Sequence, residues 1–177
     1  MKNYFFLKYQ ILLLLISIIF FFYLFGFQYV NFNNSSWLNT GDFSQIQIGW
    51  KFFKNDFWRF PLGLNPNYGI SLGNSIVFTD SIPLFAIVFK LFKNFLSDNF
   101  QYFSFWIFLC IYLQLLFAYL IVFKKTNNLY FSIIASIFFI ISPIFVYRSG
   151  IHLTLMGQWL MLFAFYIEIL DTKYKST

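Results

Sequence analysis

The chain has 177 residues, of which 60% are hydrophobic, 27% are aromatic and only 10% are charged. A soluble domain carries about 25% charged residues, so this composition excludes an ordinary soluble protein and indicates an integral membrane protein. The formal net charge of +6 does not indicate nucleic-acid binding, because the basic residues stand singly or in pairs at the ends of apolar runs. The single cysteine, Cys110, excludes a disulfide framework within the chain.

The first predicted element is a transmembrane helix over residues 9–27. These 19 residues carry no charge and would form a helix about 28 Å long. No small-residue cleavage site follows them, so we predict an uncleaved anchor and not a signal peptide. Lys2 and Lys8 place the amino terminus in the cytoplasm by the positive-inside rule.

Residues 28–99 are richer in polar residues and are predicted to form a long external loop. Within it, apolar residues between Phe43 and Phe57 recur at helical spacing, which predicts an amphipathic helix on the membrane surface with Trp50 at headgroup depth. Asp42 stands three residues before Gln45, a spacing typical of a capping box at the start of such a helix.

Residues 81–96 are apolar but include Lys90 and Lys93, whereas residues 100–123, 128–147 and 151–169 are full-length hydrophobic runs. If 81–96 does not cross the membrane, the basic residues near the ends of the four long runs all fall on the cytoplasmic side. These are Lys2, Lys8, Lys124, Lys125, Lys173 and Lys175. We therefore predict an all-α protein with one membrane domain, about four transmembrane helices, and juxtamembrane or re-entrant helices in the first external loop.

This topology brings two polar stretches to the same external face. The first is the loop, whose Pro- and Gly-rich part, residues 65–84, contains Asp80. The second follows the third crossing and contains Arg148 and His152. Polar groups at a membrane boundary are candidates for function, so we expect a site where these stretches meet.

Three segments carry a resemblance to known proteins: TDSIPL, FQYFSFWIFLCIYLQ and SPIFVYRSGIHLTLMGQWL. They resemble a family of bacterial polytopic membrane proteins classed as a domain of unknown function. The order of elements also resembles the amino-terminal half of the GT-C superfamily of polyprenyl-phosphate-dependent glycosyltransferases. The resemblance covers most of the chain after Thr40.

The resemblance implies a location in the bacterial inner membrane, a lipid-linked sugar as donor, and an early loop carboxylate, here Asp42, as catalytic base. A second acid usually follows in the second external loop of the resembled transferases. This chain has Arg148 and His152 there instead. We therefore expect His152 or Asp80 to take part of that role. No cofactor is predicted; a divalent metal is compatible with the chemistry but is not predicted.

Each candidate also has a structural interpretation. Asp42 and Asp80 are each either a helix cap or a group that meets substrate. Arg148 either binds a lipid phosphate or extends its charged end to the interface, and His152 is either a base or a structural residue. As substrate-binding candidates, Lys90 would attract a carrier phosphate and Trp50 would stack on a sugar, but both residue types also anchor helices at interfaces.

The second hypothesis is a non-enzymatic membrane protein, a carrier or an assembly partner, whose long loop is an interaction surface. The missing second acid favours it. The sequence stops soon after the hydrophobic run 151–169, so we expect the amino-terminal part of a longer protein. A carboxy-terminal half or a partner subunit, together with membrane lipid, would then be its partners.

Overall fold

The computed structural model describes residues 2–69 and 72–175. Over these residues the chain forms seven α-helices, five 3-10 helices and one sheet of two short strands. The chain divides into two compact units, and each is described by itself. Unit 1 comprises residues 1–26, 105–150 and 155–177; unit 2 comprises residues 27–104 and 151–154. The expectation of a predominantly helical protein is confirmed.

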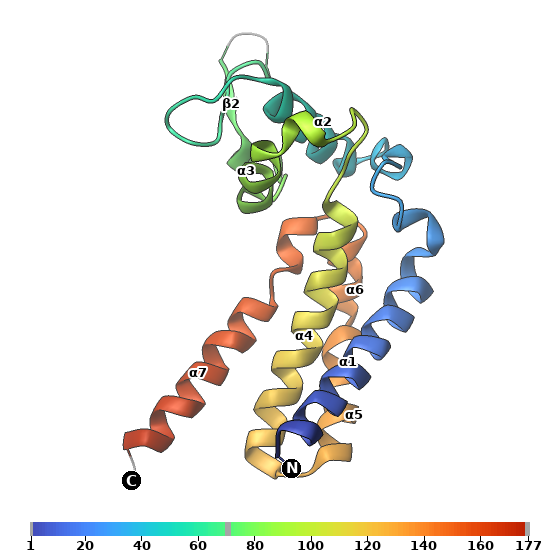
Figure 1. The fold of residues 1–177 in the computed structure, drawn as a ribbon, viewed down its shortest axis with the longest axis vertical. Helices are drawn as coiled ribbons and strands as arrows, with labels where there is room; N and C mark the ends of the chain where they lie inside the picture. The colour runs from blue at the N-terminus through green and yellow to red at the C-terminus, as the bar shows by residue number, and fades with distance from the viewer. Residues whose placement is uncertain (1, 70–71, 176–177) are drawn as a thin grey trace. The chain divides into compact units, whose positions relative to one another are not determined.

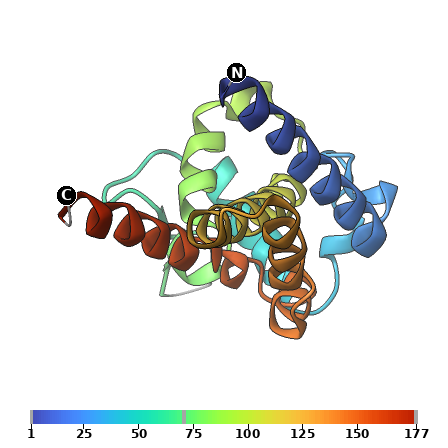
Figure 2. The same cartoon turned by 90° about the horizontal axis from the view of Figure 1, so that it is seen from below.

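Unit 1 is built from long apolar helices. They are α1 (Lys2–Phe25), α4 (Phe103–Thr126), α5 (Leu129–Ile140), α6 (Pro143–Ser149) and α7 (Trp159–Lys175). Figure 1 and Figure 2 both show α4 between α1 and α7. Tyr112 of α4 donates a 2.8 Å hydrogen bond to Gln10 of α1. On the other side of α4, the ring centroids of Phe117 and Phe163 of α7 lie 4.9 Å apart.

Two segments of the described chain are helical, long and apolar enough to cross a membrane, Phe103–Thr126 and Leu153–Asp171. The predicted crossing over 128–147 is instead two helices, α5 and α6, bent by 50°. The bend follows from Pro143, which lacks an N–H and excludes helical geometry at Ser142. The Ser142 hydroxyl compensates by accepting from the N–H of Phe145, so α6 starts with a cap.

The first and last predicted crossings also differ in detail. Helix α1 ends at Phe25, because Gly26 has φ +72°, a conformation that glycine adopts without a steric cost. The segment predicted as a continuous helix over 151–169 begins with a 3-10 turn, η5 (Leu153–Met156), and α7 starts only at Trp159. Helix α7 then continues to Lys175, so its polar end is helical as well.

Unit 2 is organised around α2 (Asp42–Asn55), which confirms the helix predicted from apolar spacing. The α2 helix packs against η2 (Ser36–Leu38), β1 (Leu64–Asn65), η3 (Ile76–Thr79) and α3 (Pro83–Leu91). The chain completes this unit with η1 (Phe27–Tyr29), β2 (Asn74–Ser75), which pairs antiparallel with β1, and η4 (Lys93–Phe95). The two-stranded sheet was not predicted, because each strand has only two residues.

The sequence predicted that the apolar face of α2 would lie on a membrane surface. This face instead packs against other parts of unit 2. Ile46, Trp50 and Phe53 are fully buried within unit 2. The Trp50 indole donates a 3.0 Å hydrogen bond to the Phe100 carbonyl and packs edge-on against the ring of Tyr102. The period of the sequence therefore predicted the helix, but the surface that covers it is protein.

Helix α3 is too short to cross a membrane by itself. Its nine residues would extend about 14 Å, less than half of the roughly 30 Å hydrocarbon layer. Lys90, near its end, is fully buried and donates to the Phe57 carbonyl at 3.2 Å. Its ammonium group lies 3.9 Å from the centre of the Phe53 ring and 4.8 Å from that of Trp58. Burial lowers the pKa of Lys90 to about 8.

The closest approach in unit 2 is between α2 and the turn that precedes α3. The Ser81 hydroxyl donates a 2.8 Å hydrogen bond to the Ile46 carbonyl and lies 2.8 Å from the Thr79 hydroxyl. Both side chains lie directly over Gly49 of α2. Only a residue without a Cβ fits there, so Gly49 sets the distance between α2 and the segment that carries Asp80.

We expect Gly49→Ala to destabilise the protein. The added methyl group would lie 2.9 Å from Ser81 Oγ and closer still to Thr79, and such overpacking costs about 1–3 kcal/mol. Gly150→Ala is the matched control, because the nearest atom to its methyl group would be 3.6 Å away. Thermal unfolding of the two variants in the same membrane mimetic should show a lower midpoint for Gly49→Ala only. Equal midpoints would contradict the close packing described here.

Candidate functional site

Unit 2 brings together three of the residues that the sequence singled out. Asp42 starts α2, Asp80 lies between η3 and α3, and His152 lies in residues 151–154, the short segment that groups with the long loop. His152 Nδ1 lies 3.9 Å from Asp42 Oδ2. Thr154, two residues after His152, donates from its hydroxyl to Asp80 Oδ1. We call these four residues the acid–base cluster.

Asp42 is not the helix cap that its spacing predicted. The N-cap position of α2 is Gly41, at φ +56°, and no side chain caps the helix there. Ser44 donates instead to the Gly41 carbonyl, at 2.6 Å. The Asp42 carboxylate therefore has no capping hydrogen bond, and 59% of its side chain is exposed. With 41% of the His152 side chain exposed as well, a substrate can reach both groups.

Asp80 does not cap α3 either. The N-cap of that helix is Ile82, and no side chain caps it. Asp80 and Ile82 both have left-handed backbones, with φ +56° and +50°. A positive φ is rare for non-glycine residues, and for a β-branched residue it is a strained conformation that costs on the order of 1–3 kcal/mol. Such strain concentrates at functional sites, so the TDSIP turn has a geometry typical of them.

The surroundings of Asp80 make it a weaker acid than an ordinary aspartic acid. Burial raises the pKa of Asp80, and the negative charge of Asp42 raises it further. His152 and the contact with Thr154 act in the opposite direction. The cluster thus places a half-buried carboxyl group of raised pKa beside an accessible carboxylate and an imidazole. Two carboxyl groups in different environments are a usual arrangement for proton transfer.

The other three predicted site residues do not belong to this cluster. Trp50 and Lys90 lie in the core of unit 2, where both have hydrogen-bond partners. Packing and hydrogen bonding within the core account for both residues, so neither requires a substrate as a partner. Arg148 lies in the last turn of α6, in unit 1, and is partly exposed. Its role as a phosphate ligand stays a prediction.

Sequence reasoning missed Thr154. The segment 151–169 was treated as one membrane crossing, so a threonine near its start was not considered as a partner for a loop carboxylate. The available signal was the spacing of His152 and Thr154, two polar residues that flank Leu153. In the 3-10 turn that follows His152, Leu153 is buried and Thr154 is bonded to Asp80.

A metal site is not apparent in this cluster. Over residues 2–69 and 72–175, no group of three or more His, Cys, Asp or Glu side chains is arranged to hold a metal ion.

Comparison with known proteins identifies one family. A family model described as "Domain of unknown function (DUF6311)" matches residues 14–176. No curated protein and no solved structure matches the chain. The match covers nearly the whole sequence, including all four residues of the acid–base cluster.

The charges around Asp80 predict opposite shifts in two variants. Asp42→Asn removes a negative neighbour and should lower the pKa of Asp80, whereas His152→Asn removes a neighbour that lowers this pKa and should raise it. Infrared titration of the carboxyl band measures both shifts, and Asp80→Asn identifies the band. Shifts in the same direction, or no shift in either variant, would show that the three groups do not interact.

Proposed function

The chain belongs to the DUF6311 family, whose function is unknown, and from its acid–base cluster we propose that it is a GT-C-like membrane glycosyltransferase or the amino-terminal portion of one. It would move a sugar from a polyprenyl-phosphate carrier to an acceptor hydroxyl on the external face of the bacterial inner membrane. One observation supports the proposal: Asp42, Asp80 and His152 are distant in the chain but lie in one unit. Their two carboxyl groups differ, because Asp42 is exposed and Asp80 has a pKa raised by burial.

The proposed topology has four crossings: α1, α4, the bent pair α5 and α6, and α7. Two of them are supported by the length and apolar character of single helices, and a third by the bent pair taken as one span. The basic residues at the helix ends then place the amino terminus in the cytoplasm. In this arrangement residues 27–102 and 150–158 both lie outside. The grouping of 151–154 with the loop supports that shared compartment.

The proposed reaction is a displacement at the anomeric carbon of the donor sugar. The acceptor oxygen forms a bond to that carbon while the bond to the carrier's phosphate oxygen breaks, and the bonding electrons leave with the phosphate. Asp42, accessible at the start of α2, takes the proton of the acceptor hydroxyl as general base. His152, whose Nδ1 lies 3.9 Å from Asp42 Oδ2, would orient the Asp42 carboxylate for this step.

The other groups would position the substrates. Asp80 is held by Thr154, and its carboxyl group would hydrogen-bond a sugar hydroxyl. Arg148 stands four residues before His152 in the chain and would pair with the carrier phosphate, for which a guanidinium group provides two parallel hydrogen bonds. In this scheme Trp50 and Lys90 only support the fold, since both are buried.

One observation favours the non-enzymatic alternative, a carrier or an assembly partner. The contacts of His152 with Asp42 and of Thr154 with Asp80 join residues 151–154 to the long loop. Such a clasp stabilises a structure without any reaction. The two functions differ in what the loss of Asp42 changes: transfer in the first case, stability alone in the second.

We expect Asp42→Asn to reduce sugar transfer by about 10²- to 10⁴-fold, the usual contribution of a general base. Asp98→Asn is the matched control, because Asp98 is an exposed acid of the same unit outside the cluster. Membranes that contain each variant at equal expression are given polyprenyl-phosphate hexoses carrying a radiolabelled sugar, and labelled product is counted. Asp98→Asn should transfer as the unmodified chain does.

Two results would count against the proposal. Transfer by Asp42→Asn at the unmodified rate would remove the base from the mechanism. No transfer by the unmodified chain, together with a lower unfolding midpoint for Asp42→Asn, would favour the non-enzymatic alternative, in which these contacts only stabilise the structure.

A further inference from the structure

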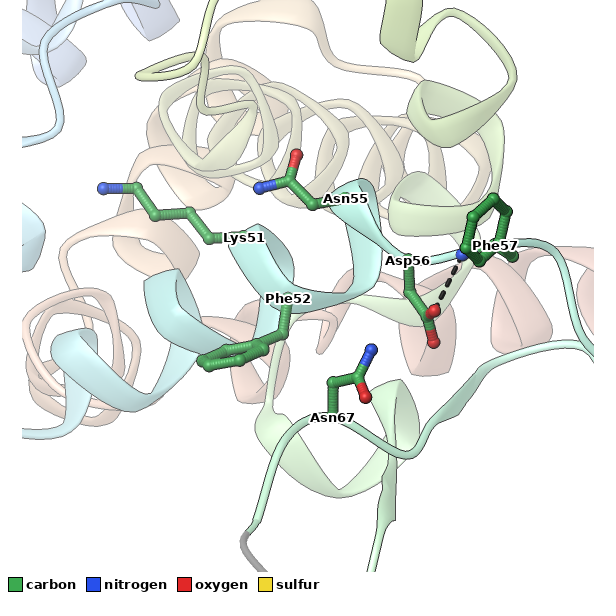
Figure 3. A pocket seen from close by; sticks show the side chains of 6 residues that line it. All are labelled: Lys51, Phe52, Asn55, Asp56, Phe57 and Asn67. Atoms are coloured by element: carbon green, nitrogen blue, oxygen red, sulfur yellow. Dashed lines mark hydrogen bonds between the residues drawn. The ribbon is translucent and has the colours of Figure 1, made fainter.

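A cavity lies in unit 2, at the carboxyl end of α2. It has a volume of about 500 Å³, within the range of small-molecule sites. Figure 3 shows the side chains that line it: Lys51, Phe52, Asn55, Asp56, Phe57 and Asn67. None of these residues belongs to the acid–base cluster, and the chemistry proposed above does not use them.

The cavity is held open by contacts between α2 and the β1–β2 hairpin. Asn65, at the end of β1, is buried, and its amide donates a 3.0 Å hydrogen bond to the Gly49 carbonyl of α2. A turn follows, in which the Tyr68 N–H donates to the Asn65 carbonyl. Asn67 lies within this turn, and its side chain extends toward the end of α2 that carries Asp56 (Figure 3). The wall that carries Asn67 is therefore fixed to the helix.

The polar groups of the lining can both donate and accept hydrogen bonds. Asn55 and Asn67 are exposed, and each amide offers a carbonyl oxygen and an NH₂ group. The Asp56 side chain is only 2% exposed and accepts three hydrogen bonds, from the Phe57 N–H at 2.8 Å, from Arg59 Nε at 3.1 Å and from Arg59 Nη2 at 3.4 Å. A carboxylate has about four acceptor positions, so Asp56 keeps capacity for one further donor from a ligand.

The apolar part of the lining consists of aromatic rings open to solvent. Phe52 is 43% exposed and Phe57 is 78% exposed. The ring of Tyr68 meets that of Phe52 edge-on, with centroids 5.9 Å apart, which fixes the orientation of the Phe52 ring. The lining therefore combines two exposed aromatic rings with two exposed amides, and the polar groups lie between the rings (Figure 3).

We propose that this cavity binds a saccharide. A sugar ring has an apolar face of C–H groups that packs on an aromatic ring, and hydroxyls at its rim that both donate and accept. The lining provides each of these contacts: Phe52 and Phe57 for the face, Asn55, Asn67 and Asp56 for the rim. A nucleotide or an anionic lipid fits less well, because Lys51 is the lining's single basic residue.

The position of the cavity suggests what the saccharide does, and this step rests on the proposed glycosyl transfer. Lys51 follows Asp42 by nine residues on the same helix, about 14 Å along its axis. A bound oligosaccharide could therefore extend from the cavity along α2 toward the base. The cavity is assigned as a subsite for the acceptor, remote from the reacting hydroxyl, and the lipid-linked donor does not enter it.

Binding is measured with the full chain in lipid nanodiscs, free of sugar-based detergents. The probes are maltotetraose, cellotetraose, mannotetraose and chitotetraose, detected by saturation-transfer NMR. We expect at least one of them to bind, and Phe52→Ala and Asn55→Leu each to weaken its binding at least tenfold. Phe95→Ala and Asn94→Leu are the matched controls, because both residues are exposed in the same unit but do not line the cavity. Both controls should bind as the unmodified chain does.

The proposal is overturned if none of the four oligosaccharides binds, or if Phe52→Ala and Asn55→Leu bind as tightly as the controls. Binding of anionic phosphatidylglycerol vesicles that depends on Lys51, without sugar binding, would assign the cavity to lipid and also overturn it. If saccharides bind but the unmodified chain transfers no sugar, the proposed function fails while the saccharide site stands.

Discussion

The pair of contacts that ties residues 151–154 to the long loop is the constraint on which the site depends. Asp42, Asp80 and His152 are far apart in sequence, and they become one cluster only because His152 faces Asp42 and Thr154 bonds to Asp80. Each contact joins a charged or polar group of the loop to the short segment that precedes α7. Without these contacts, nothing described here would hold the segment 151–154 against the two carboxyl groups.

Close packing beneath the cluster supports its geometry. Gly49 lets the Thr79–Ser81 turn lie directly on α2, and the Ser81 hydroxyl bonds to the helix backbone there. Asp80 lies within that turn, and Ile82 just after it has a left-handed backbone, which is strained for a β-branched residue and persists only where the surroundings hold it. The same helix carries Asp42 at its first residue and the cavity at its last turns, so α2 fixes the relative position of two separate sites in unit 2.

The sequence predicted the helices and the candidate carboxylates, but not their local environments. Periodicity alone showed that α2 has an apolar face, but it could not show whether lipid or protein covers that face. Trp50 of α2 was therefore expected at an interface and is in fact buried. Lys90 of α3, whose charge also suggested an interface, is buried as well. The capping predictions for Asp42 and Asp80 were wrong because Gly41 and Ile82 occupy the cap positions, with backbones that no local pattern indicated.

The breaks in the helices were also only partly predictable from the sequence. A proline after Ser142 was visible in the sequence, yet the apolar run through it was read as one helix, because hydrophobicity averages over a bend. Thr154 was hidden by the same averaging, since it lies in a predominantly apolar segment. Long-range contacts such as the one between Thr154 and Asp80 depend on tertiary structure, and a single sequence contains little information about them.

The most direct test of this account is proximity between Asp42 and His152 in the membrane. The natural Cys110 is replaced by serine, and Asp42→Cys and His152→Cys are combined in one full-length chain. A short bifunctional thiol reagent that does not cross membranes should link the two cysteines when added from the external side. A chain that combines Asp42→Cys with Lys173→Cys, where the second residue is expected on the cytoplasmic side, should not be linked. If the first pair is labelled only from opposite sides of the membrane, the cluster does not exist and the proposed site is wrong.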